Sequence, residues 1–204
     1  MRRSFPLLVP IYLGAALVGV HGTAHPTTPV AAVADTTTVA RPSPARWDRR
    51  VERPVRVFIA PGRSTAGWHP DLIDAVWNGF RRWSTQGVPV RFARVTSPSA
   101  AGVVVEWVES LPGSCIGKTW RQDVDGEIST ARITLALHDH RGRLLTADMQ
   151  RGAALHEIGH LLGLEHVGHR DSIMYPQVWV TDISAGDRTA LRDLYVKRSH
   201  ATAD

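Results

Sequence analysis

Two histidines and a glutamate in the sequence HEIGH form the clearest chemical pattern in this chain of 204 residues. His156 and His160 stand four residues apart, so on an α-helix both imidazoles lie on one face and can bind one metal ion. Glu157 follows the first histidine, where its carboxylate can act as general base on a water molecule at that ion. Gly163 allows a sharp turn out of the helix, which would bring His166 to the same metal. Three neutral imidazoles leave a fourth position for water, which is the pattern of a catalytic zinc site.

A methionine follows this pattern, since Met174 lies eight residues after His166 in the sequence SIMYP. The whole arrangement, H-E-x-x-H-x-x-G-x-x-H followed by a methionine turn, resembles the metzincin zinc endopeptidases. The MYP turn and the later sequence GDRTALRDLY are most similar to the matrixin branch, whose catalytic domain is of the matrix metalloproteinase type. The resemblance extends over residues 53–199 and is most specific between residues 156 and 176.

The resemblance implies an endopeptidase, and the chemistry of the site predicts hydrolysis of the peptide bond by a zinc-activated water with Glu157 as general base. The resemblance further implies that Met174 forms an apolar floor beneath the metal without binding it. It also implies that Asp187, in the last helix, supports the methionine turn.

By the same resemblance, the chain from Pro176 onward lines the pocket for the substrate residue that follows the cleaved bond. The pocket residues expected on this basis are Tyr175, Pro176 and Val178, and Val178 stands where related sequences often have a tyrosine. Tyr175 could alternatively be a fifth zinc ligand, although the metzincin branch that uses such a tyrosine places it after a histidine.

Two other groups of residues offer ligands for additional metals. His138 and His140 follow the last expected strand, in a region where matrixins carry structural metals, and could bind a second zinc. The alternative is that both are solvated loop residues. Asp123, Asp125 and Glu127 could bind a structural calcium, but a hairpin turn at residues 125–126 also explains this sequence.

The single cysteine, Cys115, excludes both an intrachain disulfide and a thiolate-rich zinc site. In the matrixin layout, the sequence CIGKTWRQ forms the sheet edge over the cleft, where an extended peptide can add to the sheet. Cys115 would then lie near the active site, either as a semi-buried thiol or as a reactive one. No cysteine precedes it, so the pro-segment cysteine that caps the zinc of matrixins is missing. Gly186 replaces an aspartate of the family, so we expect no activation by ion pairing of a new N-terminus.

The elements that must position these residues follow from hydrophobic periodicity and turn signals. The sequence predicts helices over residues 70–84, 146–162 and 184–197, and strands over 55–60, 88–95, 103–108, 115–122 and 127–137. This order predicts an α+β fold, namely a twisted mixed sheet with two long helices, a zinc cleft and a C-terminal helix.

The first fifty residues read as segments outside the folded domain. Arg2 and Arg3 precede an apolar run over residues 5–20 and small residues follow, which is the pattern of a secretory signal peptide over residues 1–24, with cleavage as late as residue 34. A membrane anchor is the alternative, but Pro6 and Pro10 interrupt this short run. Residues 25–51 are rich in Pro, Thr and Ala and read as a linker or short pro-segment, followed by the peptidase domain over 52–200.

The net charge of +5 permits a nucleic-acid binder, but two of these charges leave with the signal peptide, so we expect no nucleic-acid partner. A non-catalytic zinc-containing module that binds peptides or a partner is the other competing class, and the intact Glu157 argues against it. We therefore expect a secreted or cell-envelope protease, monomeric, with protein or peptide substrates and with no stable membrane insertion after signal removal.

Overall fold

The structure is a computed structural model that describes residues 45–47 and 50–196. The predicted signal peptide and most of the predicted linker lie outside the described residues. Within the described part of the chain, no helix is both long enough and apolar enough to cross a membrane.

Five strands form one mixed sheet in the order β2-β1-β3-β5-β4. Strands β1, β2, β3 and β5 pair in parallel, and β4 pairs antiparallel with β5, so β4 is an edge strand. This agrees with the edge position that the matrixin resemblance implies. The strands are β1 (Arg50–Ile59), β2 (Val90–Arg94), β3 (Val103–Val108), β4 (Gly117–Val124) and β5 (Glu127–Ala136).

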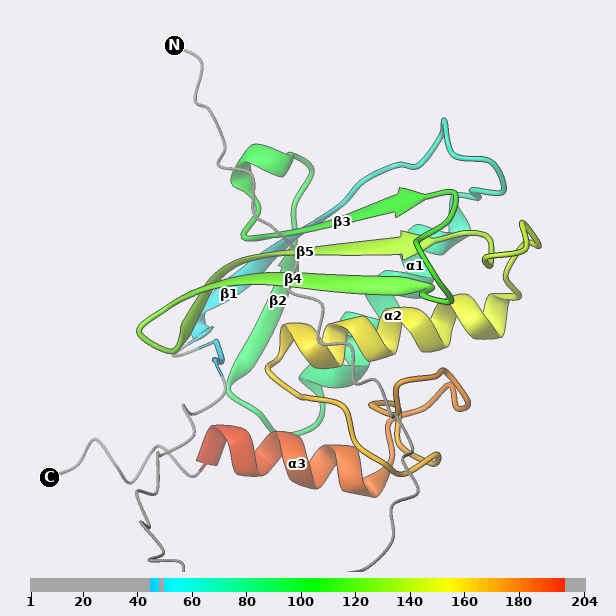
Figure 1. The fold of residues 1–204 in the computed structure, drawn as a ribbon. Coiled ribbons are helices and arrows are strands. Elements are labelled where there is room, and N and C mark those ends of the chain that lie inside the picture. Colours follow the sequence, from blue (N-terminus) through cyan, green and yellow to red (C-terminus); the bar gives the residue numbers. More distant parts are fainter. Residues whose placement is uncertain (1–44, 48–49, 197–204) are drawn as a thin grey trace, which may run out of the picture. The chain divides into compact units, whose positions relative to one another are not determined.

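Three α-helices complete the fold, and Figure 1 shows α1 and α2 on one side of the sheet with α3 beyond α2. They are α1 (Asp71–Ser84), α2 (Ala147–Leu161) and α3 (Ala185–Val196), and a short 3-10 helix occupies Pro98–Ala100. Along β3, buried and half-buried residues alternate, as expected for a sheet covered on one face. The α+β fold class predicted from the sequence is confirmed.

The core lies between the covered face of the sheet and helices α1 and α2. Phe80 and Trp83 of α1 are fully buried, and the Trp83 indole donates a hydrogen bond to the Leu155 carbonyl of α2 at 2.9 Å. At Gly79 the two helices approach so closely that a Cβ atom would lie 2.9 Å from Ile158. Helix α1 therefore supports α2 from the side opposite the cleft.

Helix α2 is buried on almost all sides along its second half, where every residue from Gly152 to Gly159 is buried. A helix of this kind shows no amphipathic stripe, because apolar neighbours surround it. Thr146 caps its start by accepting a hydrogen bond from the Met149 backbone.

Two residues of the predicted linker belong to the packed structure. The side chain of Trp47 is 2% exposed, and its indole donates to the Leu161 carbonyl at 2.9 Å. Arg46 donates to the Leu194 carbonyl at 2.9 Å and, through its backbone, forms a bridge with Glu127. The packed domain thus includes residues before position 52, because one aromatic side chain can bury itself without any periodic pattern around it.

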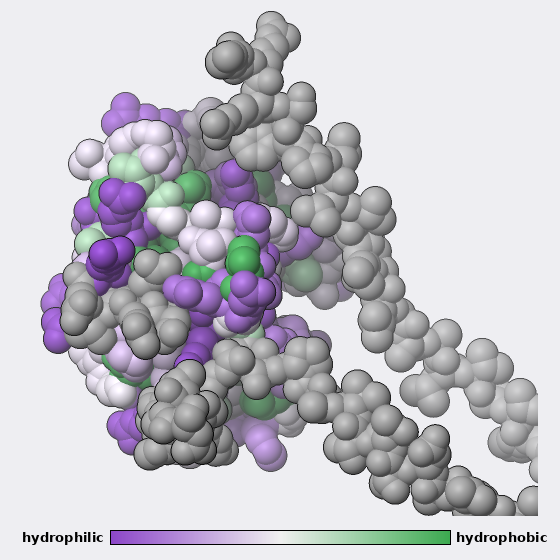
Figure 2. All heavy atoms as spheres, turned by 90° about the vertical axis from the view of Figure 1, so that its left-hand side faces the viewer, coloured by the Kyte–Doolittle hydropathy of each residue, from purple (hydrophilic) through white to green (hydrophobic). Residues whose placement is uncertain are grey.

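On the coloured part of the face shown in Figure 2, hydrophobic residues form small separate spots among hydrophilic ones. The exposed large apolar side chains are also separate in sequence. Among the described residues they are Trp120, Val124, Leu144, Met149 and Trp179.

Candidate active site

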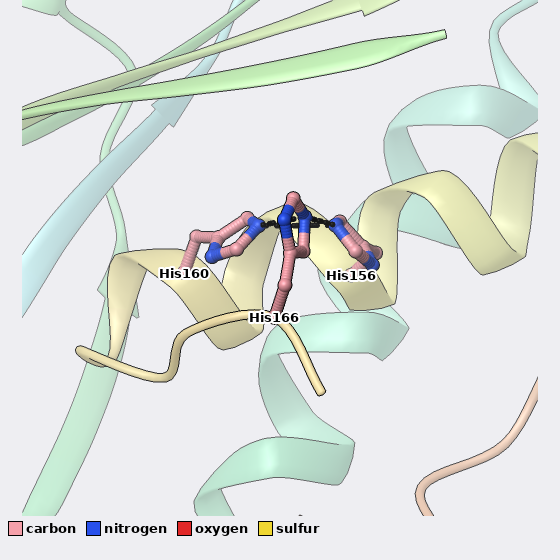
Figure 3. A group of neighbouring side chains, drawn as sticks. All are labelled: His156, His160 and His166. Atoms are coloured by element: carbon pink, nitrogen blue, oxygen red, sulfur yellow. Dashed lines mark hydrogen bonds between the residues drawn. The ribbon is translucent and has the colours of Figure 1, made fainter. Parts of the chain in front are cut away.

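Three histidine side chains converge at the C-terminal end of α2, as Figure 3 shows. His156 and His160 project from the last turns of the helix, and His166 comes from the chain after it. Their Nε2 atoms lie 3.0 Å apart for His156 and His160, and 3.1 Å apart for each pair that includes His166. Sequence spacing alone predicted this convergence.

The hydrogen bonds at the Nδ1 atoms define what the Nε2 atoms can do. Nδ1 of His156 donates to the Ile173 carbonyl at 2.7 Å, and Nδ1 of His160 donates to the Leu164 carbonyl at 2.8 Å. In neutral imidazoles, these bonds leave a lone pair on each Nε2, and two lone pairs facing each other repel. A cation between them removes this repulsion, so the donor set fits a metal ion.

The spacing fits zinc in particular. Tetrahedral zinc with Zn–N bonds of about 2.0–2.1 Å places two ligand nitrogens about 3.4 Å apart, close to the distances found here. Burial lowers the pKa of His156, and burial lowers the pKa of His160 to about 4. Both imidazoles are therefore neutral at physiological pH, which is the form that binds a metal.

The turn after α2 follows from the glycine at its end. Gly163 has φ of 102°, in the region that disfavours residues with a Cβ atom. The turn lets the Leu164 backbone N–H donate to the Gly159 carbonyl at 3.1 Å, and it brings the Leu164 carbonyl to His160. The turn predicted at Gly163 thus orients one histidine as well as redirecting the chain toward His166.

The methionine turn holds His156 by a hydrogen bond to a backbone carbonyl of the turn. Asp187, 3% exposed, accepts hydrogen bonds from the Ser172 hydroxyl, from the Ile173 backbone at 3.1 Å and from the Ser184 backbone at 2.8 Å. Ile173 in turn accepts the bond from His156. A carboxylate with three donors is well satisfied inside the protein, and here it ties α3 to the ligand turn.

Met174 is buried against α2 at Gly159, between the two helical histidines. A Cβ atom at position 159 would collide with the Met174 sulfur. This contact places Met174 against the helix turn between the two histidines, and its role as a floor beneath the metal stays a prediction.

Glu157 lies against strand β4. Its side chain is 5% exposed, and its Oε2 atom lies 2.7 Å from the Thr119 hydroxyl. A Cβ atom at Gly117 would lie only 2.6 Å from Oε1. Burial raises the pKa of Glu157 to about 7, and the hydrogen bond from Thr119 acts in the opposite direction. A carboxyl group with this pKa can both accept and release a proton near neutral pH.

Arg121 connects β4 to the end of the helix. Its guanidinium donates to the His160 carbonyl and lies 3.4 Å from the Glu165 carboxylate. Gly117, Thr119 and Arg121 were not among the predicted site residues. Their alternation along one strand would place them on one face, but only the fold shows that α2 lies against that face.

The cleft has a volume of about 530 Å³. Pro176 and Val178 line it, whereas Tyr175 is not among its lining residues. His140 and Cys115 also line the cleft, and Cys115 is exposed rather than semi-buried. Gly117, Thr119 and Glu157 line the same cleft.

Within the described residues, the three histidines form the only group of at least three side chains of His, Cys, Asp or Glu able to hold one ion. His138 and His140 join no such group, and Asp123, Asp125 and Glu127 form none. Asp125 and Gly126 instead have φ values of 52° and 77°, as a tight hairpin between β4 and β5 requires.

A mixed sheet with an antiparallel edge strand, a helix carrying two of three convergent histidines and a buried methionine packed against that helix define a metzincin type of domain. The model of the matrixin family matches residues 68–196, which is more than half of the chain. The chain therefore belongs to the matrixin family, a family of zinc metalloproteases.

Two curated relatives match over short segments. Matrix metalloproteinase-26 of Homo sapiens is 49% identical over 47 residues, covering 21% of this chain and 18% of the relative. Matrilysin of Felis catus is 45% identical over 51 residues, covering 22% of this chain and 20% of the relative. The chain thus matches about a fifth of the length of each.

Proposed function

We propose that this protein is a zinc-dependent endopeptidase in which His156, His160 and His166 hold the metal and Glu157 is the general base. A zinc ion bound there supplies a Lewis acid that polarises the peptide carbonyl and acidifies water. Glu157 accepts a proton from the attacking water and delivers it to the leaving amine. The observation that carries the proposal is the buried carboxylate of Glu157 in the same cleft as three convergent imidazoles.

Strand β4 supplies the means of holding an extended substrate. It pairs on one side with β5, so its other edge can form backbone hydrogen bonds with a peptide. The substrate residue after the cleaved bond then enters the cleft beside Pro176 and Val178. Backbone recognition of this kind accepts many sequences, and the pocket adds selectivity.

Cleavage of a quenched peptide library by the zinc-loaded protein tests this function. We expect cleavage that a chelator abolishes and that zinc restores. Glu157→Gln keeps the shape of the side chain but removes the base, so it should lose cleavage and retain one zinc ion per chain. Glu109→Gln, at an exposed position on the loop after β3, is the matched control and should remain active.

The alternative is a zinc-containing module that binds peptides without cleaving them. That class would be supported if the folded, zinc-loaded wild type bound library peptides and released no products, and the proposed function would then be wrong.

We also propose that the protein is exported and acts as a monomer outside the cytoplasm. The basic residues and apolar run within residues 1–24 support export. N-terminal sequencing of the protein from culture medium and envelope fractions tests this, with a first residue between positions 25 and 35 expected. A protein found only in the cytoplasm with residues 1–24 intact would contradict it, and light scattering measures the mass in solution.

A further inference from the structure

The two oxygens of the Glu157 carboxylate have different surroundings. Oε2 lies 2.7 Å from the Thr119 hydroxyl. Oε1 lies beside Gly117, where the missing side chain leaves space, and no described residue forms a hydrogen bond with it. One oxygen is therefore held by the edge strand, and the other lies beside Gly117, a residue that lines the cleft.

The hydroxyl of Thr119 has two acceptors within reach but only one hydrogen. The backbone carbonyl of Glu157 lies at 2.9 Å, and the carboxylate oxygen lies at 2.7 Å. A charged acceptor forms the shorter and stronger bond, so the hydroxyl hydrogen points to Oε2 when Glu157 is ionised.

The position of the hydroxyl is itself well determined. Thr119 pairs across the sheet with Ile133 of β5, whose side chain is 1% exposed. The branched side chain of threonine also has few rotamers on a strand. Pairing with β5 and the few rotamers of threonine thus fix the hydroxyl, whereas a glutamate side chain has three torsions that must be fixed before it can act.

We propose that Thr119 is a positioning residue for the general base: its hydroxyl holds Oε2 of Glu157 and leaves Oε1 free for the water that attacks the peptide bond. Gly117 completes this arrangement, because any side chain there would push the carboxylate aside. The inference rests on the proposed function. It gives strand β4 two roles, namely binding the substrate backbone and orienting the general base.

Thr119→Val keeps the branched shape and removes the hydroxyl. Loss of a comparable orienting partner costs about ten- to a hundredfold in activity, and we expect this loss in kcat, with KM within about threefold of wild type. Thr119→Ser retains the hydroxyl and should restore most of kcat. Both variants should keep one zinc ion per chain.

A second measurement does not depend on activity. In the chelator-treated protein, three-bond NMR couplings report whether the Glu157 side chain occupies one rotamer. We expect one rotamer in wild type and in Thr119→Ser, and averaging in Thr119→Val. If the valine variant does not fold, Thr119→Ala takes its place in both measurements.

Thr134 offers a matched control, because its hydroxyl lies 3.2 Å from the Glu106 carboxylate on the other face of the same sheet. Thr134→Val removes a hydroxyl–carboxylate bond away from the cleft and should change neither kcat nor the Glu157 rotamer.

The experiments give a different result if the Thr119 hydroxyl only joins β4 to the backbone of α2. If Thr119 only bonds the helix backbone, Thr119→Val lowers the melting temperature or zinc content and leaves the Glu157 rotamer unchanged, which overturns the proposal. Equal kcat in Thr119→Val and wild type also overturns it. If the wild type cleaves no peptide, the proposed function fails, while the NMR couplings still decide whether Thr119 positions Glu157.

Discussion

The same cleft is lined by residues 156–166, called the ligand segment, and by strand β4. Contacts between residues close in sequence shape the ligand segment, whereas contacts between distant residues position β4. Within the ligand segment, helical spacing and one glycine turn bring His156, His160 and His166 together, and His160 bonds to Leu164 of the same segment. Strand β4 lies against α2 because it pairs with β5 in the sheet. Thr119 and Glu157, which form this contact, are 38 residues apart in sequence. Local geometry thus brings the three ligands together, with a further bond from His156 to Ile173, whereas the base is arranged by contacts between distant segments.

The largest effect is expected within the ligand segment. His166→Ala removes one of three ligands, so zinc affinity should fall by at least about a hundredfold, more than the loss of an outer partner costs, and cleavage should vanish. Zinc competition with a fluorescent chelator measures the affinity. His69→Ala, at an exposed histidine just before α1, is the control. Retention of wild-type zinc affinity in His166→Ala would contradict the local arrangement.

The next largest effect is expected at Trp47, which packs against the end of α2, and it concerns the free energy of unfolding. Trp47→Ala deletes a buried aromatic side chain and its bond to Leu161, next to the ligand helix end, so the free energy of unfolding should fall by about 3–5 kcal/mol. Urea denaturation measures this. Trp120→Ala, at a residue 43% exposed, should cost less than about 1 kcal/mol. Equal losses in the two variants would show that residues 45–47 do not support the domain.

The buried carboxylate should give a pH-dependent effect. The pKa of Glu157 is raised from its ordinary value of 4.5 to about 7, so ionisation above pH 7 costs the folded state more than the unfolded state. Below pH 4.5 both states are protonated and this cost disappears. In chelator-treated protein, Glu157→Gln should therefore increase the free energy of unfolding by about 3 kcal/mol at pH 8 and by little at pH 4.

Denaturation of both proteins at several pH values isolates this contribution, because all other titratable groups are common to both. Glu109→Gln controls for the loss of one negative charge. A stability difference that does not grow between pH 4 and pH 8 would mean that β4 and α2 do not bury the carboxylate as the structure has it.

The smallest effect is expected at the rim of the contact between β4 and the helix end. Arg121→Gln removes the bonds to the His160 carbonyl and to Glu165, which should lower the free energy of unfolding by about 1 kcal/mol. Arg132→Gln removes a more exposed ion pair with Glu106 on the opposite face and should cost less. Hydrogen exchange at the end of α2 should increase only in Arg121→Gln, and identical exchange in both variants would remove Arg121 from the supports.

Much of this arrangement was predictable. The helices, the strands and the hairpin at Asp125 and Gly126 follow from periodicity and turn residues, which act over a few neighbouring positions. The convergence of the histidines follows from the same local geometry. Thr119 and Gly117 were not predictable in this way, since nothing in the sequence of β4 identifies the helix against which it packs.

The sequence alone thus determined the metal-ligand pattern and the class of fold, because helix periodicity and a glycine turn are short-range properties. The tertiary structure decided the rest. It brought β4 onto Glu157, buried that carboxylate, placed Asp187 beneath Ile173 and packed Trp47 under the helix end. The physical reason is that burial and hydrogen bonding between distant segments depend on which surfaces meet, and this is known only when the whole chain has folded.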